Sequence, residues 1–248
     1  MKNIFITIAA FLFFASAAFG QEAVPTPESS PPAVVASVND NTSIDLARAT
    51  LAAHGGDRFI KIKTLVLRGT ADLSTAGSTQ TIPASFAIVI SDVRYRFDIH
   101  SQAFSYRQIY HGQQSYSSIP GFSLPLDKMG LEMLRKINEK DYTVSALPEK
   151  FKKKKGFRIT SPEGSYTDLI VDEKTNLVKE FESSYDVNGN TLTTSVSIDK
   201  YREVDGVLIY EKFSQRMETP QGMLYGNFMA RDIQVNVEIG DDVFTMPK

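Results

Sequence analysis

Two-residue turn signals between runs of alternating apolar residues restrict the fold of this chain more than any other feature of its sequence. Asn188-Gly189 and Asp205-Gly206 are strong hairpin signals, because both central residues of the tightest hairpin turns must adopt a positive φ. The segments around such turns alternate apolar and polar residues with the period of two that is typical of strands. The expected strands cover residues 65–73, 82–90, 93–99, 104–110, 114–118, 156–160, 166–172, 177–185, 191–201, 207–217 and 223–237. The sequence therefore predicts an antiparallel, mostly sequential sheet of about ten to eleven strands.

Two segments show the periodicity of helices. Residues 43–54 repeat apolar side chains at helical spacing, with Thr42 or Ser43 as the N-cap and Gly55-Gly56 as the end. Residues 126–140 carry apolar side chains on one face and charged side chains on the other. Strands spaced by ~4.8 Å make a sheet about 50 Å wide, whereas two helices of ~10 Å diameter cover about 20 Å of it. The remaining apolar face is buried if the sheet curls, splits into a sandwich or lines a groove for another molecule.

The first 41 residues differ in composition from the rest of the chain. Residues 1–20 combine Lys2, an apolar run and a stretch of small residues, which is typical of a secretory signal peptide, with cleavage after Ala17 or Gly20. An uncleaved N-terminal anchor is the alternative. Residues 21–41 form a Pro-rich segment that we expect to be a disordered linker. Residues 42–248 are then one domain of an exported protein, periplasmic or otherwise, that is soluble after removal of the signal peptide.

Composition excludes several classes of function. The chain has 27 Lys and Arg against 29 Asp and Glu, so it lacks the basic surplus that nucleic-acid binding usually needs. It has no Cys, and therefore no disulfide, thiolate nucleophile, cysteine zinc site or lipidated N-terminal Cys. His54, His100 and His111 are not at metal-ligand spacing, and the sequence contains no phosphate-binding loop or nucleophile elbow. We expect no cofactor, no metal site and no catalysis.

Three stretches carry short motifs whose order along the chain is informative. Residues 92–97 (Asp-Val-Arg-Tyr-Arg-Phe) place an aromatic, a basic and a second aromatic residue in one predicted strand. Residues 109–120 contain a strand, a Gly-containing turn, an aromatic strand and Pro, followed by the predicted helix 126–140, and the ending 242–247 contains Phe244 and Pro247. In this order the motifs resemble the periplasmic lipoprotein carrier LolA and its relative LolB, where the helix is a lid and the chain closes with Phe-x-x-Pro.

The resemblance implies an α+β fold, namely a curled, incomplete antiparallel β-barrel with lid helices over an apolar cavity. It implies a carrier of lipid or lipoprotein acyl chains that is loaded and unloaded with the help of envelope membrane proteins. Where the carriers commonly place a basic residue and a proline, this chain has Ser91-Asp92, so the cargo itself stays open. The candidate cavity residues are Leu65, Leu67, Phe86, Ile88, Tyr95, Phe97, Met129, Met133, Ile137, Leu192, Val196, Ile198, Phe213 and Phe228. Plain packing in the core is the alternative role for each of them.

Other interpretations of the same sequence remain open. The groove of an envelope interaction or sensor module would receive a peptide or protein segment instead of a lipid. A glycan hydrolase would need a carboxylate pair, for which Asp168 and Asp172 are candidates. The Lys run at 150 and 152–155 is a solvated turn or a contact for anionic lipid. Residues 186–190 resemble the opening of a calcium loop but fit a hairpin turn better.

Overall fold

The computed structural model describes residues 41–112, 114–120, 122–187, 189–219 and 222–247. The predicted signal peptide and nearly all of the predicted linker lie outside the described residues. The helices are α1 (Asn41–Ala53), α2 (Asp57–Ile60) and α3 (Leu131–Leu134), with 3-10 turns η1 (Leu126–Lys128), η2 (Glu149–Phe151) and η3 (Asp241–Phe244). The strands are β1 (Thr64–Thr75), β2 (Ile82–Ser91), β3 (Arg94–Ser101), β4 (Ser105–His111), β5 (Gln114–Ser117), β6 (Thr143–Ala146), β7 (Gly156–Thr160), β8 (Tyr166–Val171), β9 (Val178–Val187), β10 (Asn190–Val204), β11 (Val207–Thr219) and β12 (Gly222–Val235).

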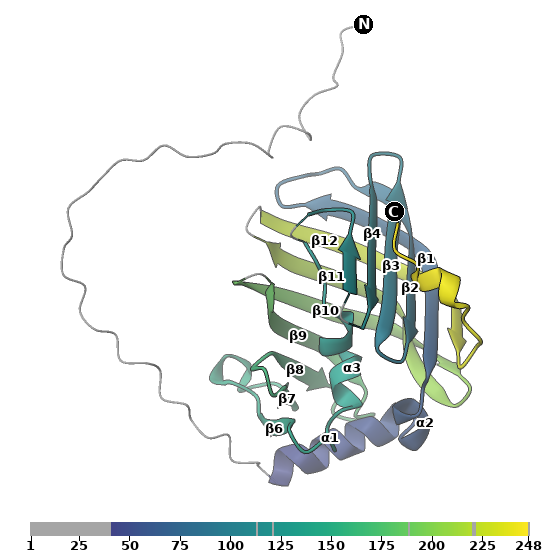
Figure 1. Ribbon diagram of the computed structural model, residues 1–248. Coiled ribbons are helices and arrows are strands. Elements are labelled where there is room, and N and C mark those ends of the chain that lie inside the picture. Colours follow the sequence, from purple (N-terminus) through teal and green to yellow (C-terminus); the bar gives the residue numbers. More distant parts are fainter. Residues whose placement is uncertain (1–40, 113, 121, 188, 220–221, 248) are drawn as a thin grey trace, which may run out of the picture. The chain divides into compact units, whose positions relative to one another are not determined.

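These strands form one antiparallel sheet in the order β5-β4-β3-β2-β1-β12-β11-β10-β9-β8-β7-β6. Neighbouring strands in the sheet are also consecutive in sequence, except that β1 pairs with β12, which joins the two halves of the chain. The two edge strands, β5 and β6, follow one another along the chain. The segment 118–142 therefore runs from one edge of the sheet to the other, and the barrel stays open between them (Figure 1).

The inner face of the sheet forms a single apolar core. Buried side chains as far apart in the strand order as Phe97 on β3, Phe228 on β12 and Phe157 on β7 belong to one cluster, which requires the sheet to curl on itself. The predicted fold, an incomplete antiparallel barrel with few helices, is confirmed. Within the described residues the sheet has twelve strands, one more than the largest number expected. The additional strand is β6, whose four residues are too short to show a clear alternation.

The outer face of β1 to β4 is covered by the C-terminal segment. Phe244 on η3 packs with Val66, Val89 and Ile109 in a second apolar cluster. The Arg94 guanidinium lies 4.7 Å from the centre of the Phe244 ring and binds Asp241 at 2.6 Å. The closing motif that resembles the carriers therefore seals the back of the sheet and does not line its interior.

One predicted helix is correct and the other is wrong. The helix expected at 43–54 is α1, which packs on β6 and β7. The helix expected at 126–140 is broken into η1, α3 and turns, because Met129 is extended (φ −138°) and Gly130 has φ +61°. A Cβ on Gly130 would lie 2.6 Å from the ring of Phe181, so the chain passes directly over β9 at this point. Of the apolar positions of the pattern, Met133, Leu134 and Ile137 are buried, and Leu126 and Met129 are partly buried.

Candidate functional site

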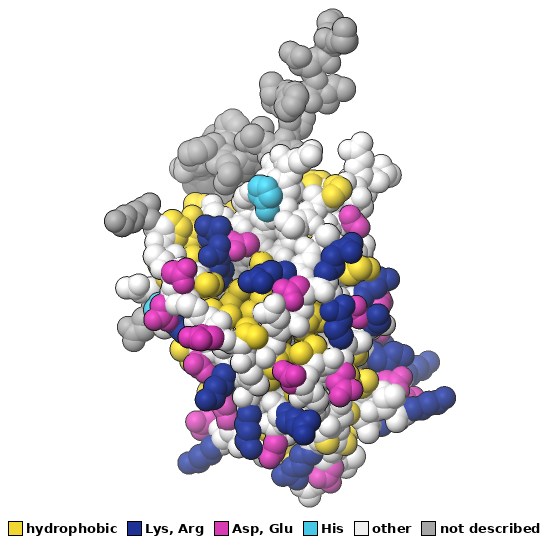
Figure 2. Space-filling model, turned by 90° about the vertical axis from the view of Figure 1, so that its right-hand side faces the viewer, with side chains coloured by type: hydrophobic (Ala, Val, Ile, Leu, Met, Phe, Trp, Pro, Cys, Tyr) yellow, Lys and Arg dark blue, Asp and Glu magenta, His cyan; other side chains and the backbone are white. Residues whose placement is uncertain are grey.

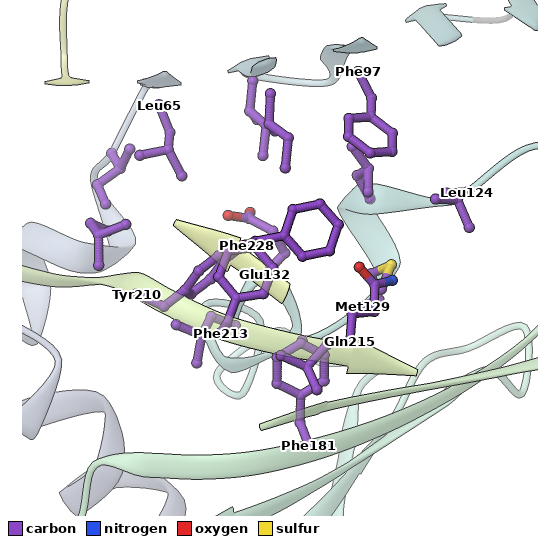
Figure 3. A pocket seen from close by; sticks show the side chains of 18 of the residues that line it. Leu65, Phe97, Leu124, Met129, Glu132, Phe181, Tyr210, Phe213, Gln215 and Phe228 are labelled. Atoms are coloured by element: carbon purple, nitrogen blue, oxygen red, sulfur yellow. The ribbon is translucent and has the colours of Figure 1, made fainter. Parts of the chain in front are cut away.

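An apolar cavity of about 70 Å³ lies between the inner face of the sheet and residues 122–137, which we call the lid (Figure 3). The sheet contributes walls from β1, β2, β3, β9, β10, β11 and β12, and the lid closes the space. The lining residues are Phe59, Ile62, Leu65, Ile88, Ile90, Phe97, Leu124, Leu126, Met129, Gly130, Leu131, Glu132, Phe181, Val196, Ile209, Tyr210, Phe213, Gln215 and Phe228.

Aromatic side chains form much of the wall on the sheet side. The rings of Phe213 and Phe228, which are directly opposite one another on β11 and β12, are stacked with centroids 4.8 Å apart. A β-bulge brings a further ring to the same face: Lys200 pairs with Lys212 and Tyr201 pairs with Tyr210, so Glu211 is the extra residue. Tyr210 then meets Phe213 edge to face at 4.8 Å.

The first half of the lid is attached to the sheet by one buried glutamine. The side-chain oxygen of Gln108 on β4 accepts a hydrogen bond from the Leu124 backbone N–H at 2.8 Å, and its amide donates to the Leu124 carbonyl at 2.9 Å. The Tyr95 hydroxyl also donates to that carbonyl at 2.9 Å, and Gln108 further binds Tyr106 and Ser123. Gln108 therefore satisfies a backbone segment that has no strand partner.

The second half of the lid is held by further polar contacts, among them an ion pair of Lys128 with Glu163 at 3.6 Å. The Gly130 N–H donates to the Ser183 hydroxyl on β9 at 3.1 Å. Arg135 donates to the backbone carbonyls of Ile60 and Ile62, after α2, and binds the Glu132 carboxylate at 2.8 Å. The lid is thus fixed to the sheet and to α2 by separate polar contacts, and between them its apolar side chains are buried in the core.

The candidate cavity residues divide into two groups. Leu65, Ile88, Phe97, Met129, Val196, Phe213 and Phe228 line the cavity. Leu67, Phe86, Met133, Ile137 and Leu192 are buried in the surrounding core, Ile198 packs against that core, and Tyr95 stacks on Tyr110 and anchors the lid. Their role in ligand binding stays a prediction.

Sequence reasoning missed several lining residues. Phe181 follows the apolar–polar alternation of its strand, so the sequence could have identified it as a cavity residue. Tyr210 could not, because the bulge at Glu211 changes which face of β11 it occupies. Glu132 and Gln215 were not considered because charged and amide side chains are usually exposed.

Three polar side chains interrupt the apolar lining. Glu132 reaches the cavity from the lid, and Tyr210 and Gln215 reach it from β11 (Figure 3). Burial raises the pKa of Glu132 above its usual value, and Arg135 opposes this effect. Burial also raises the pKa of the Tyr210 hydroxyl, and the nearby Glu132 carboxylate adds to the shift. The cavity therefore has a polar wall as well as an apolar one.

His54 has a structural role at the end of α1. Its side chain is fully buried; its Nδ1 lies 3.3 Å from the Leu208 carbonyl, and its Nε2 accepts from the Val178 N–H at 3.2 Å. This pattern requires the neutral imidazole, and burial lowers the pKa of His54 to about 4. The helix C-terminus would favour a cation here, but the cost of burying a charge is larger. Across the described residues, no group of three or more His, Cys, Asp or Glu side chains could hold a metal ion.

The two aspartates considered for hydrolysis do not form a pair. Asp168 is fully buried and binds Arg158 with both carboxyl oxygens, at 2.6 and 2.8 Å. Asp172 instead accepts three hydrogen bonds from Lys174 and Thr175 in the turn before β9. Both carboxylates stabilise local structure, and neither lines the cavity.

The Lys run lies over the outer face of β9. Lys150 and Lys154 form ion pairs with Glu182 and Glu180, and Lys155 donates to Asn176. Pairing with glutamates favours a solvated turn over a contact with anionic lipid. At residues 186–190 the Gly189 N–H donates to Asp186 at 2.9 Å in the β9–β10 hairpin, while Asn188 lies outside the described residues.

The end of the barrel opposite α1 is apolar and poor in charge. Phe104, Ile119 and Leu224 are exposed there, at 39%, 44% and 40% of their surface. The connections 76–81, 102–104 and 118–120 at this end contain no charged residue. Figure 2 shows the charged side chains gathered below this upper end. No helix in the described ranges is long and apolar enough to cross a bilayer.

Comparison with known proteins supports the fold. No protein-family model matches the sequence, and no curated protein matches it. A solved LolA superfamily protein from Nitrosomonas europaea is similar in structure, with a TM-score of 0.51 and 13% identity over 81% of this chain and 97% of that one. A DUF1329 family protein from Desulfovibrio piger matches with a TM-score of 0.46 and 12% identity, over 82% of this chain and 96% of that one. The fold is LolA-like. The predicted resemblance is thereby confirmed for the architecture of the domain.

Proposed function

We propose that this chain is an exported carrier that binds lipid or lipoprotein acyl chains beneath the lid, without covalent chemistry. The observation that carries the proposal is the cavity itself, whose walls are mostly apolar and aromatic and whose roof is an irregular segment held by separate polar contacts.

Binding would act by shielding apolar chains from water. Each buried methylene contributes about 0.8 kcal/mol, so a groove that holds part of an acyl chain is enough for useful affinity. The cavity of about 70 Å³ is far smaller than the roughly 300–1,000 Å³ of typical ligand pockets. The lid must therefore move away from the sheet to admit a chain, and its return would expel one.

The apolar side chains at this end of the barrel support contact with a lipid surface during loading or release. Phe104, Ile119 and Leu224 can enter the interfacial region of a bilayer, while the exposed Arg216–Glu218 ion pair beside Leu224 can stay among the head groups. In this proposal Phe104→Asp reduces co-sedimentation with phosphatidylcholine vesicles, whereas Val93→Asp does not, because Val93 is exposed at the opposite end. Equal binding by both variants would remove this part of the proposal.

The experiment that tests the carrier is native mass spectrometry of the full chain purified from an exported fraction without detergent, followed by lipid extraction. A reproducible bound lipid is the expected result. Val196→Phe fills the cavity with an apolar side chain and should abolish the bound lipid. Val93→Phe adds the same ring at an exposed site and should retain it.

Movement of the lid can be followed separately. The chain has no Trp, so Phe122→Trp places a single aromatic reporter on the lid without adding bulk to the cavity lining. An acyl chain that enters the cavity should shift the emission of this Trp, and the shift should be absent in the Val196→Phe background. An empty protein whose reporter does not respond to acyl chains would refute the carrier and favour an interaction module that binds a protein segment.

A further inference from the structure

We propose that the cavity selects amphiphiles whose head group donates hydrogen bonds and carries no negative charge, such as an amine, with Glu132 and Tyr210 as the head-group site. The inference rests on the proposed function, since it assumes that the cavity binds an apolar chain. It adds the chemical class of the head group that this chain carries.

The first step of the argument is the orientation of an ion pair. Glu132 and Arg135 bind each other at 2.8 Å, but Glu132 lines the cavity and Arg135 does not. The Arg135 guanidinium is directed away, toward the backbone carbonyls of Ile60 and Ile62. Figure 3 shows the Glu132 carboxyl group directed into the space between the sheet and the lid. The pair therefore presents its negative member to a ligand.

The second step is unused hydrogen-bonding capacity. One oxygen of Glu132 accepts from Arg135, and within the described ranges the other accepts no hydrogen bond. The Tyr210 hydroxyl likewise has no hydrogen-bond partner among the described residues. Tyr210 lies close enough to Glu132 for the carboxylate to raise the pKa of its hydroxyl. Neither oxygen is fully buried, so a ligand in the cavity can supply the hydrogen-bond partner that water otherwise supplies.

The third step is the chemistry of that partner. An ionised carboxylate only accepts hydrogen bonds, and in a wall of low polarity it repels a second carboxylate or a phosphate. A donor such as an ammonium or hydroxyl group would bind Glu132, and Tyr210 could either donate to it or accept from it. The apolar rings of Phe213 and Phe228 would then surround the first part of the chain.

The test is a binding series in which the chain is constant and the head group varies. Dodecylamine, dodecanol, methyl dodecanoate and dodecanoate are titrated into the full chain carrying the Phe122→Trp reporter. A charge-assisted hydrogen bond predicts that dodecylamine binds about tenfold or more tightly than methyl dodecanoate. Dodecanoate should bind most weakly.

Matched variants assign the effect to the two side chains. Glu132→Gln keeps the shape of the side chain and should reduce the preference for the amine to within about threefold, with little change for methyl dodecanoate. Tyr210→Phe keeps the ring that packs on Phe213. It should weaken the binding of dodecanol and dodecylamine and leave the affinity for methyl dodecanoate unchanged. Because the ester reports on the apolar walls alone, it reveals any variant that has lost its fold.

The outcomes separate the two proposals. If none of the four compounds binds, the carrier itself is refuted. If all four bind with similar affinity, or if dodecanoate binds most tightly, the carrier stands and the head-group site is refuted. A preference for the amine that survives in Glu132→Gln would also overturn the site.

Discussion

Protonation of the buried His54 should make this fold lose stability in mild acid. In the folded chain the ring is neutral: its Nδ1 lies 3.3 Å from the Leu208 carbonyl oxygen, and its Nε2 accepts a hydrogen bond from the Val178 N–H. A second proton on the ring would remove the acceptor for Val178 and leave a buried charge. Burial accordingly lowers the pKa of His54 from 6.5 to about 4.

The sign of the effect follows from proton binding. Between pH 6.5 and 4 the unfolded chain binds a proton at His54 that the folded chain does not, so stability falls as the pH falls. At 1.36 kcal/mol for each pKa unit, the loss between pH 7.5 and pH 5 is about 2 kcal/mol. The full loss, about 3 kcal/mol, is reached only below the folded pKa of about 4.

The assay is urea unfolding followed by circular dichroism at several pH values from 7.5 to 5. His54→Gln should be less stable than the wild type at pH 7.5, by about 1–3 kcal/mol, because it loses the buried hydrogen bonds of the ring. The difference in stability should shrink toward pH 5, because only the wild type has a buried imidazole whose low pKa makes its stability fall with the pH. His111→Gln, at an exposed site on β4, serves as the control for removing an imidazole. Parallel stability curves for wild type and His54→Gln would refute the reasoning.

Three further substitutions test the lid and the outer face by urea unfolding. Gly130→Ala should lower the free energy of unfolding by about 1–3 kcal/mol more than Gly77→Ala does. Both glycines have a positive φ, but only at Gly130 would the added Cβ lie 2.6 Å from a ring. Equal losses of stability in the two variants would contradict this close approach. Gln108→Leu should cost about 2 kcal/mol or more and increase amide hydrogen exchange at Leu124, because the Leu124 backbone loses its partners; unchanged exchange would rule out the clamp. Phe244→Ala should cost about 3–5 kcal/mol, as expected for a ring that is 1% exposed, and a loss below 1 kcal/mol would show that the C-terminal segment does not seal the sheet.

The local pattern of side chains determined most of the sheet. Alternation and turn pairs such as Asp205-Gly206 act over a few residues, and this is why the hairpins of β9 to β12 could be predicted from sequence. The first helix could be predicted for the same reason, since its apolar repeat and the Gly55-Gly56 pair that ends it are both local. The family resemblance then supplied the order in which these elements close around a cavity, and the comparison with solved structures confirmed that fold.

Tertiary structure decided the features that depend on contacts between distant segments. The segment 126–140 has the apolar repeat of a helix, but contact of Gly130 with Phe181 on β9 breaks it into shorter pieces. The pairing of β1 with β12 and the burial of His54 between two strands involve residues more than a hundred positions apart. The Glu132 carboxylate faces the cavity because Arg135 is held by α2, which no local pattern encodes. Periodicity reports which face of an element is buried, whereas only the assembled fold decides what that face meets.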